Sequence, residues 1–258
     1  PCFARNVESS EWHGRTVRWH QCEVNIEATA PVRTRAREIL AELIAQDSWR
    51  LALDAVRAVE QAVQRTAGLE VAWMKDPEAF RTSWLPEREL ALGLLTTALA
   101  RHSHPIVHWT VRRMLQCALA REEDEAFGAK LRDVLAAVRD DLDLQLLGVI
   151  LSDGYVELRE EPGVPKGEAR NETMARWEER IGRVVDALVA ARPTATEAVE
   201  YLDGLVAESL EAGYFPRLGE LLPVLARRHP ELAGAMVPAF HAPGRIPEIA
   251  VAWYHLLF

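Results

Sequence analysis

Lysine is scarce in this chain, since only Lys75, Lys130 and Lys166 stand among its 30 basic residues. This arginine bias, together with abundant alanine, is typical of a GC-rich bacterial genome. The net charge of −9 is uneven. Residues 1–121 hold 16 basic and 14 acidic residues, a net charge of +2, whereas residues 122–258 hold 14 and 25, a net charge of −11. A strongly negative half repels phosphate backbones and argues against nucleic acid as a partner.

Cysteine and long apolar runs are also rare. Cys2, Cys22 and Cys117 form no CxxC pair, and so odd and sparse a set is typical of reduced cytoplasmic thiols rather than of a disulfide framework. The longest uncharged runs, such as residues 90–100 and 232–244, fall well short of the ~18 apolar residues that a membrane span needs. We therefore expect a cytoplasmic protein that does not enter a membrane.

The two ends of the chain lack the usual marks of a complete protein. No initiator methionine precedes Pro1, and no apolar core follows it to form a signal peptide. The final residues 250–258 stop inside an apolar helical pattern. We therefore expect the chain to be part of a longer polypeptide.

The opening residues 1–31 form a leading segment that differs from the rest. Apolar and polar residues alternate over residues 16–28, including Ile26 and Ala28, and this period of two predicts a short β-strand. A lone strand leaves its edge unpaired, so its partner would lie in another domain. The alternative is an extended segment that lies along the first helices.

From residue 32 the apolar period is helical, which predicts one helical-repeat domain over residues 32–258. Glycine and proline gather at about 152–170, where we expect a long surface loop. A first hairpin is expected over residues 32–65 and a second over 86–121, beginning at Pro86 after an irregular loop at 69–85. Further helices are expected at 124–140, 141–151, 171–191, 195–212, 214–228, 231–241 and 247–257.

Each of the first helices carries a predicted buried stripe. The first stripe is Ala36, Ile39, Leu40, Leu43 and Ile44; the second is Leu53, Val56, Val59 and Val63; the third is Leu90, Leu94, Leu95 and Leu99; the fourth is Val107, Val111, Met114, Leu115 and Ala118. The two hairpins match when Leu51 is aligned with Val107, which pairs Arg57 with Arg113 and Asp47 with Ser103. Short connections force antiparallel neighbours, so the fold class we predict is all-α, with four to five stacked hairpins forming an α-solenoid.

Candidate metal ligands are the cluster of His102, His104 and His108, with Cys117 further along. His104 and His108 have the i, i+4 spacing of ligands on one helix face, but no HExxH pattern occurs, and a position before Pro105 favours a cap. A second candidate set comprises His13, His20 and Cys22. It has three ligands, whereas a structural zinc site usually has four. Phosphate-binding, serine-elbow and paired-cysteine motifs are missing as well. We expect no metal and no cofactor.

Charged residues offer two interpretations. The carboxylates Glu157, Glu160, Glu161, Glu178 and Glu179 are expected to be solvated. The clustered arginines carry more weight as candidate functional residues than these carboxylates. They include Arg33, Arg35, Arg37, Arg57, Arg112, Arg113, Arg227 and Arg228. One helix of each hairpin in a solenoid lines a concave surface, so Arg57, Arg112 and Arg113 are the candidate interaction surface. The alternative, which we favour, is that the arginines pair with carboxylates of neighbouring repeats.

Residues 41–59, AELIAQDSWRLALDAVRAV, and 97–115, TALARHSHPIVHWTVRRML, resemble HEAT-type repeats: a helix, a polar turn, and a second helix with a central arginine. HEAT-like arrays occur in scaffolds, in sensor regions of bacterial STAND-type defence NTPases and in alkylpurine DNA glycosylases. The resemblance implies a non-catalytic interaction, sensor or scaffold region of a larger bacterial polypeptide in antiviral defence, which binds a protein partner or other domains of its own chain. The alternative is a HEAT-like DNA glycosylase acting on alkylated bases, which would need a cationic groove.

Overall fold

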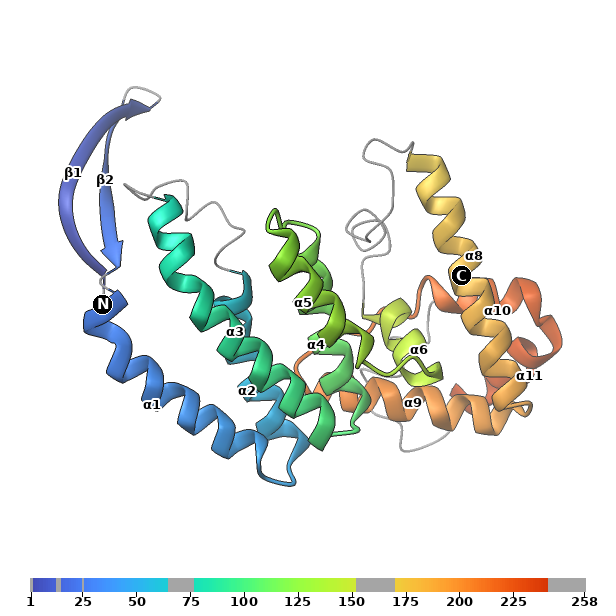
Figure 1. Ribbon diagram of the computed structural model, residues 1–258. Coiled ribbons are helices and arrows are strands. Elements are labelled where there is room, and N and C mark those ends of the chain that lie inside the picture. The colour runs from blue at the N-terminus through green and yellow to red at the C-terminus, as the bar shows by residue number, and fades with distance from the viewer. Residues whose placement is uncertain (1, 13–14, 25, 65–76, 152–169, 241–258) are drawn as a thin grey trace. The chain divides into compact units, whose positions relative to one another are not determined.

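From Ile26 onward, every regular element in the described part of the chain is a helix, which confirms the all-α class (Figure 1). The computed structural model describes residues 2–12, 15–24, 26–64, 77–151 and 170–240. The helices are α1 (Ile26–Ile44), α2 (Trp49–Gln64), α3 (Pro77–Arg101), α4 (Pro105–Leu119), α5 (Glu125–Ala136), α6 (Leu142–Ile150), α8 (Arg170–Ala191), α9 (Ala195–Glu211), α10 (Leu221–Arg228) and α11 (Pro230–Phe240). None of these described helices is both long and apolar enough to cross a membrane.

Two strands precede the helices. β1 (Cys2–Trp12) and β2 (Arg15–Val24) pair antiparallel, with Cys2 opposite Val24 and an irregularity in register between Ala4 and Asn6. α1 begins directly afterwards, so Ile26 and Ala28, which the alternation assigned to a strand, are helical.

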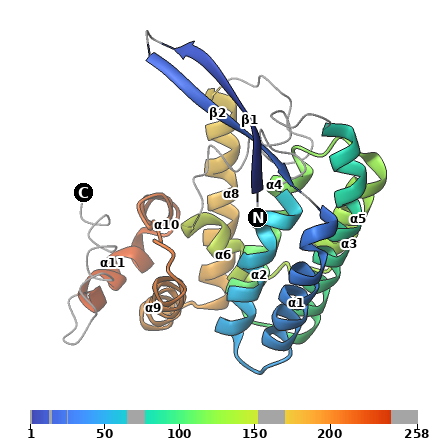
Figure 2. The same cartoon turned by 90° about the vertical axis from the view of Figure 1, so that its left-hand side faces the viewer.

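The chain divides into two compact units. Unit 1 is formed within Pro1–Ser103 and Thr110–Ala137, and unit 2 within His104–Trp109 and Val138–Phe258. In unit 1, α1 packs on α2 and α3, α2 packs on α3, and α3 packs on α5. The two views agree that α1, α3 and α5 lie on one side of this unit, whereas α2 and α4 lie on the other (Figures 1 and 2).

Unit 2 is built from α6 and from α8 to α11. α9 packs on α11, α10 packs on α8 and α11, and α6 packs on α8. Local sequence defines several helix ends here. Asp141 caps α6 by accepting the N–H of Leu144, and Thr194 and Glu197 form a reciprocal capping box at the start of α9. α9 ends at Glu211, and the positive φ of 78° at Gly213 just beyond it allows the N–H of Tyr214 to reach back to the carbonyl of Ser209.

Several predicted boundaries are wrong. α3 begins at Pro77, so Pro86 lies inside the helix, where its missing N–H leaves the preceding turn one hydrogen bond short. Burial of Trp84, which is 8% exposed, accompanies this longer helix. α10 begins at Leu221 and not at 214, since the glycine stop at Gly213 is followed by a connection. The expected helix at 247–257 and residues 152–169 of the expected loop lie outside the described residues.

The predicted stripes of α2 and α4 are confirmed, because all their members are buried. The stripe of α1 is wrong in part: Ala36 is exposed and Ile39 is 42% exposed, whereas Arg33 and Arg37 are half-buried. Long arginine stems can cover apolar surface, so the helix turns this arginine face inward. On α3, Leu90 of the predicted stripe is likewise 47% exposed.

Burial also corrects the alignment of the two hairpins by a single position, so that Ala52, and not Leu51, corresponds to Val107. The buried positions of α2 are Ala52, Leu53, Ala55, Val56, Val59 and Val63. Their counterparts in this alignment are Val107, His108, Thr110, Val111, Met114 and Ala118, and all are buried. With Leu51 on Val107 instead, Val56 and Val63 would match the half-buried Arg112 and Leu119. We call the corrected alignment the burial register. It sets Arg57 against Arg112, and not against Arg113.

We expect Leu53→Asp or Val111→Asp to lower the free energy of unfolding by at least about 3 kcal/mol, because each places a carboxylate in the core of unit 1. Leu53 is 2% exposed and Val111 is fully buried. Chemical denaturation would measure the loss, with Asp54→Ala as the control on the exposed face of α2. Equal midpoints for the Leu53 and Asp54 variants would contradict the assigned core.

Candidate interaction surface

A buried arginine joins three helices of unit 1. Arg88 on α3 is 4% exposed. Its Nη2 donates to Glu122 Oε2 at 2.6 Å and lies 3.3 Å from the carbonyl oxygen of Val63 at the end of α2. The guanidinium carbon also lies 3.7 Å from the ring centroid of Phe127 on α5. A cation against an aromatic face is favourable when water is excluded.

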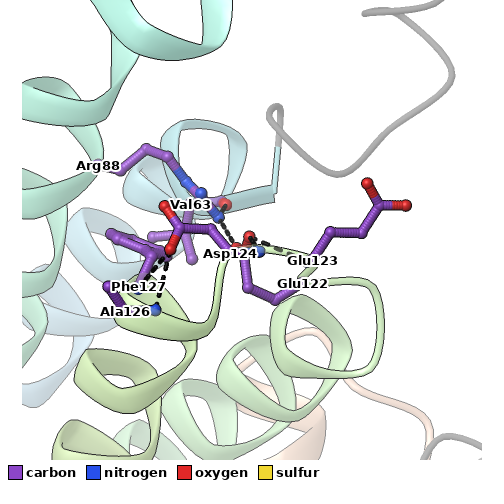
Figure 3. A network of polar contacts seen from close by, with 7 residues as sticks. All are labelled: Val63, Arg88, Glu122, Glu123, Asp124, Ala126 and Phe127. Carbon is purple, nitrogen blue, oxygen red and sulfur yellow. Dashed lines mark hydrogen bonds and ion pairs between the residues drawn. The ribbon is translucent and has the colours of Figure 1, made fainter. Parts of the chain in front are cut away.

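The same network shapes the start of α5 (Figure 3). Glu122 Oε1 accepts the backbone N–H groups of Glu123 and Asp124, at 3.2 and 3.0 Å. Asp124 in turn caps α5 by accepting the N–H groups of Ala126 and Phe127. One carboxylate therefore both neutralises Arg88 and holds the turn that leads into α5.

Arg33 on α1 makes the equivalent contacts one repeat earlier, since the burial register sets Arg33 against Arg88. Arg33 Nε lies 3.1 Å from Glu87 Oε1, and its guanidinium carbon lies 5.4 Å from the ring centroid of Trp84. Both arginines thus bind a carboxylate and an aromatic ring associated with the next helix on the same side of the unit. We call these two contacts the arginine struts.

The struts support the inter-repeat interpretation for part of the arginine set. Arg37 also pairs with Glu87, whereas Arg35 pairs within its own helix with Glu38 at 2.9 Å. Sequence reasoning missed Arg88, because its importance is visible only once the burial register is known.

Two further contacts close the end of α1. Arg101 Nη2 donates to the carbonyl of Ala45 at 2.7 Å, and His102 Nε2 lies 2.8 Å from the carbonyl of Ile44. A carbonyl can only accept, so the proton of His102 sits on Nε2. These side chains satisfy carbonyls that a helix end leaves without intrahelical partners.

The other histidines are also engaged by the backbone. His104 Nδ1 accepts the N–H of Ile106 at 3.3 Å, so His104 occupies the expected cap position, and its Nε2 lies 3.7 Å from Glu208 Oε2. His108 Nδ1 accepts the N–H of Arg139 at 3.2 Å. Across the described ranges, no group of three or more metal-ligating residues could hold a metal ion. Of the second candidate set, His13 and the side chains of His20 and Cys22 lie outside the described residues.

The three predicted surface arginines lie in unit 1, on the side formed by α2 and α4. Arg57, Arg112 and Arg113 are each half-buried. Arg57 and Arg113 also make polar or ring contacts with other groups. The burial register places Arg57 and Arg112 at equivalent positions, whereas Arg113 corresponds to Ala58. The pair that the repeat brings to the same face is therefore Arg57 and Arg112.

In unit 2, the last turn of α10 is fastened to α8. Asp186 on α8 accepts bonds from Arg228 and from His229 Nε2, and Arg227 pairs with Glu178. Gly182 makes room for the guanidinium, since a Cβ there would lie 2.9 Å from Arg228 Nη1. The hydrogen bonds from Arg228 and then His229 lower the pKa of Asp186 to about 2. Arg227 and Arg228, in the last turn of α10, therefore serve as contacts between α10 and α8.

A second polar group links α6 to α9. The Tyr201 hydroxyl donates to Asp143, and the Arg192 guanidinium carbon lies 4.7 Å from the tyrosine ring centroid. Burial, and then the bond to Asp143, raise the pKa of Tyr201, so the hydroxyl stays protonated. The pKa of Glu208 is raised as well, mainly by burial and to a smaller extent by repulsion from Asp143 and Glu211. The arrangement joins two helices through a satisfied hydrogen bond.

Comparison of the chain with models of known protein families, with curated proteins and with solved structures gave no match.

We expect Arg88→Ala to destabilise unit 1 by about 3–5 kcal/mol, because it leaves the Glu122 carboxylate, only 9% exposed, without its counter-charge. Glu122→Ala should cost a similar amount, and a double-mutant cycle should show strong coupling between the two residues. Lys130→Ala provides the control, since its pair with Glu89 is about half exposed and should contribute at most about 1 kcal/mol. Additive effects at Arg88 and Glu122 would contradict the strut.

The lowered pKa of Asp186 predicts a specific acid sensitivity. Because the folded-state pKa of about 2 lies below the ordinary 3.8, the ionised carboxylate adds stability that is complete above about pH 4 and lost as the pH falls toward 2. Denaturation at a series of pH values should show this dependence. Gly182→Ala should weaken it by displacing Arg228, although Asp186 is retained. Gly204→Ala, where nothing lies within 4 Å of the added Cβ, should leave it intact.

Proposed function

We propose that the chain is a non-catalytic protein-interaction module, in which stacked HEAT-like hairpins form an α-solenoid that serves as a scaffold or sensor region. The observation that carries the proposal is the repeated arginine strut. The buried positions of α2 match those of α4 in the burial register, and Arg33 and Arg88 make the same kind of contact in that register. A repeated contact between successive helices is what an array of stacked hairpins requires.

The binding surface we propose lies on α2 and α4. The arginine struts lie on the side formed by α1, α3 and α5, whereas Arg57 and Arg112 stand at equivalent positions on α2 and α4. Arginine binds carboxylates bidentately, so the partner that fits is a protein surface rich in Asp and Glu. Such a surface could belong to a separate protein or to another domain of the same polypeptide.

The wider setting is proposed on the resemblance alone. It supports a cytoplasmic bacterial polypeptide of the STAND type, acting in antiviral defence, of which this chain would be the recognition region. The strongly acidic residues 122–258 weigh against the alternative of a DNA glycosylase for alkylated bases.

A photo-crosslinking residue at Ala58, exposed on α2, should capture the partner, whereas the same residue at Ala41, exposed on α1, should not. Once the partner is identified, Arg57→Glu/Arg112→Glu should weaken binding about 10-fold or more in calorimetric titration at low salt. The effect should be smaller at high salt, because salt screens charges that reach solvent within about 8–10 Å at physiological ionic strength. The melting temperature should barely change.

Arg132→Glu on α5 is the matched control, since it reverses an exposed arginine on the opposite side of unit 1. A large loss of stability in the Arg57/Arg112 variant would show instead that these residues hold the repeats together. Excision of an alkylated base from methylated DNA by the purified chain would refute the non-catalytic assignment.

A further inference from the structure

α1 carries an exposed apolar stripe about a quarter-turn around the helix from Arg33, the residue of its arginine strut. Val32, Ala36 and Ile39 follow at spacings of four and three residues, which place them on one side of a helix. Val32 is 69% exposed and Ile39 is 42% exposed, and Ala36 between them is exposed as well. We call these three residues the α1 stripe.

The burial register shows what this face can accept. The positions of α3 that correspond to the α1 stripe in this register are Glu87, Ala91 and Leu94. On α3 that face receives α1 itself, since Glu87 binds Arg33 and Arg37, and Ala91 is only 2% exposed. The α1 stripe is therefore equivalent to the surface of α3 against which the preceding helix packs. Because Val32 replaces the acceptor Glu87, the incoming helix should present apolar side chains there and not an arginine.

The charges beside the stripe are complementary to themselves. Arg35 lies in its first half and is 61% exposed. Glu38 lies just before Ile39 and is 55% exposed, and Glu42 lies about one turn beyond Ile39 and is 65% exposed. If a second copy of α1 lies antiparallel across the stripe, a two-fold axis between Glu38 and Ile39 sets Arg35 of each copy beside Glu42 of the other. Antiparallel helix dipoles favour the same arrangement. The small side chain of Ala36 would let the two helices approach closely.

We propose that the α1 stripe is a self-association surface, on which a second copy of this chain docks its own α1 in the antiparallel direction. The three residues of the stripe bury less area than a standard protein–protein interface. The dimer should therefore be weak, with a Kd on the order of 100 μM. This inference is independent of the proposed partner surface, because that surface uses α2 and α4.

Sedimentation velocity on the 258-residue chain, from about 5 to about 500 μM, brackets the expected Kd. The unaltered chain should move from monomer to dimer over this range. Val32→Glu/Ile39→Glu should remain monomeric, because it sets carboxylates against apolar residues across the axis. Phe215→Ala is the control, since Phe215 is 83% exposed but lies in unit 2, and it should dimerise normally.

Charge exchange tests the antiparallel geometry directly. Arg35→Glu alone, or Glu42→Arg alone, should raise the Kd about 3- to 30-fold, because like charges then meet across the axis. An equimolar mixture of the two variants should associate more tightly than either alone, since each copy then supplies the charge that the other needs. High salt should reduce these differences. Circular dichroism would show that both variants keep their helices.

Several results would overturn the proposal. The chain could remain monomeric at the highest concentration, or the Val32/Ile39 variant could dimerise as well as the unaltered chain. Loss of association in Phe215→Ala would place the contact elsewhere. A mixture of the charge variants that associates no better than its components would exclude the antiparallel pairing. If the apolar double variant fails to fold, the charge-exchange series decides the question.

Discussion

The buried guanidinium group of Arg88 constrains unit 1 more than any other polar contact described within it. A charge taken out of water costs several kcal/mol unless it is paired and hydrogen-bonded. Through its Nη2 and its aromatic contact, Arg88 has partners from different parts of the chain, namely Glu122 before α5, Phe127 within α5 and the Val63 carbonyl at the end of α2 (Figure 3). Its Nε is buried without a hydrogen-bond partner among the described residues. In a different arrangement of these helices, the buried charge would lose its partners and its full desolvation cost would not be offset. The interaction therefore favours one packing of α2, α3 and α5 over its alternatives.

The Arg33 strut repeats this chemistry in a more solvated form. Its side chain and that of Glu87 are 18% and 15% exposed, against 5% and 9% for Arg88 and Glu122. The contact between α1 and α3 is thus less isolated from water than that between α3 and α5. Equivalent apolar residues differ in the same way, because Ala36 on α1 is exposed whereas Ala91, its counterpart on α3, is 2% exposed. α1 therefore has the character of an edge helix, which packs on α2 and α3 and leaves Val32, Ala36 and Ile39 exposed.

Unit 2 relies on apolar burial with polar contacts at its margins. Leu221, Leu222 and Leu225 of α10 are fully buried, whereas Asp186 and Arg228 beside them are 43% and 48% exposed. Exposed ion pairs usually contribute little, so the leucines provide the stability and the ion pair sets how the end of α10 meets α8. In both units, then, arginine orients helices that apolar side chains hold together. This use of arginine leaves Arg57 and Arg112 as the equivalent pair on the side formed by α2 and α4.

The amino-acid sequence by itself determined the helical class, the inward faces of α2 and α4, and the break between α5 and α6. These features depend on period and on local caps such as Asp141, which act within a few residues of the chain. It did not determine the start of α3, because a proline inside a helix can be tolerated when tertiary contacts hold the turn. Nor did it reveal the burial register, since His108 and Thr110 are polar residues buried at positions where the preceding repeat has Leu53 and Ala55. The inward face of α1 was hidden for the same reason. Arg33 and Arg37 look like surface residues in any sequence pattern, and only the placement of Glu87 on a neighbouring helix makes their burial favourable. Charge pairing between distant segments is a property of the tertiary structure, because the free energy of a buried arginine depends on a partner that the local sequence does not contain.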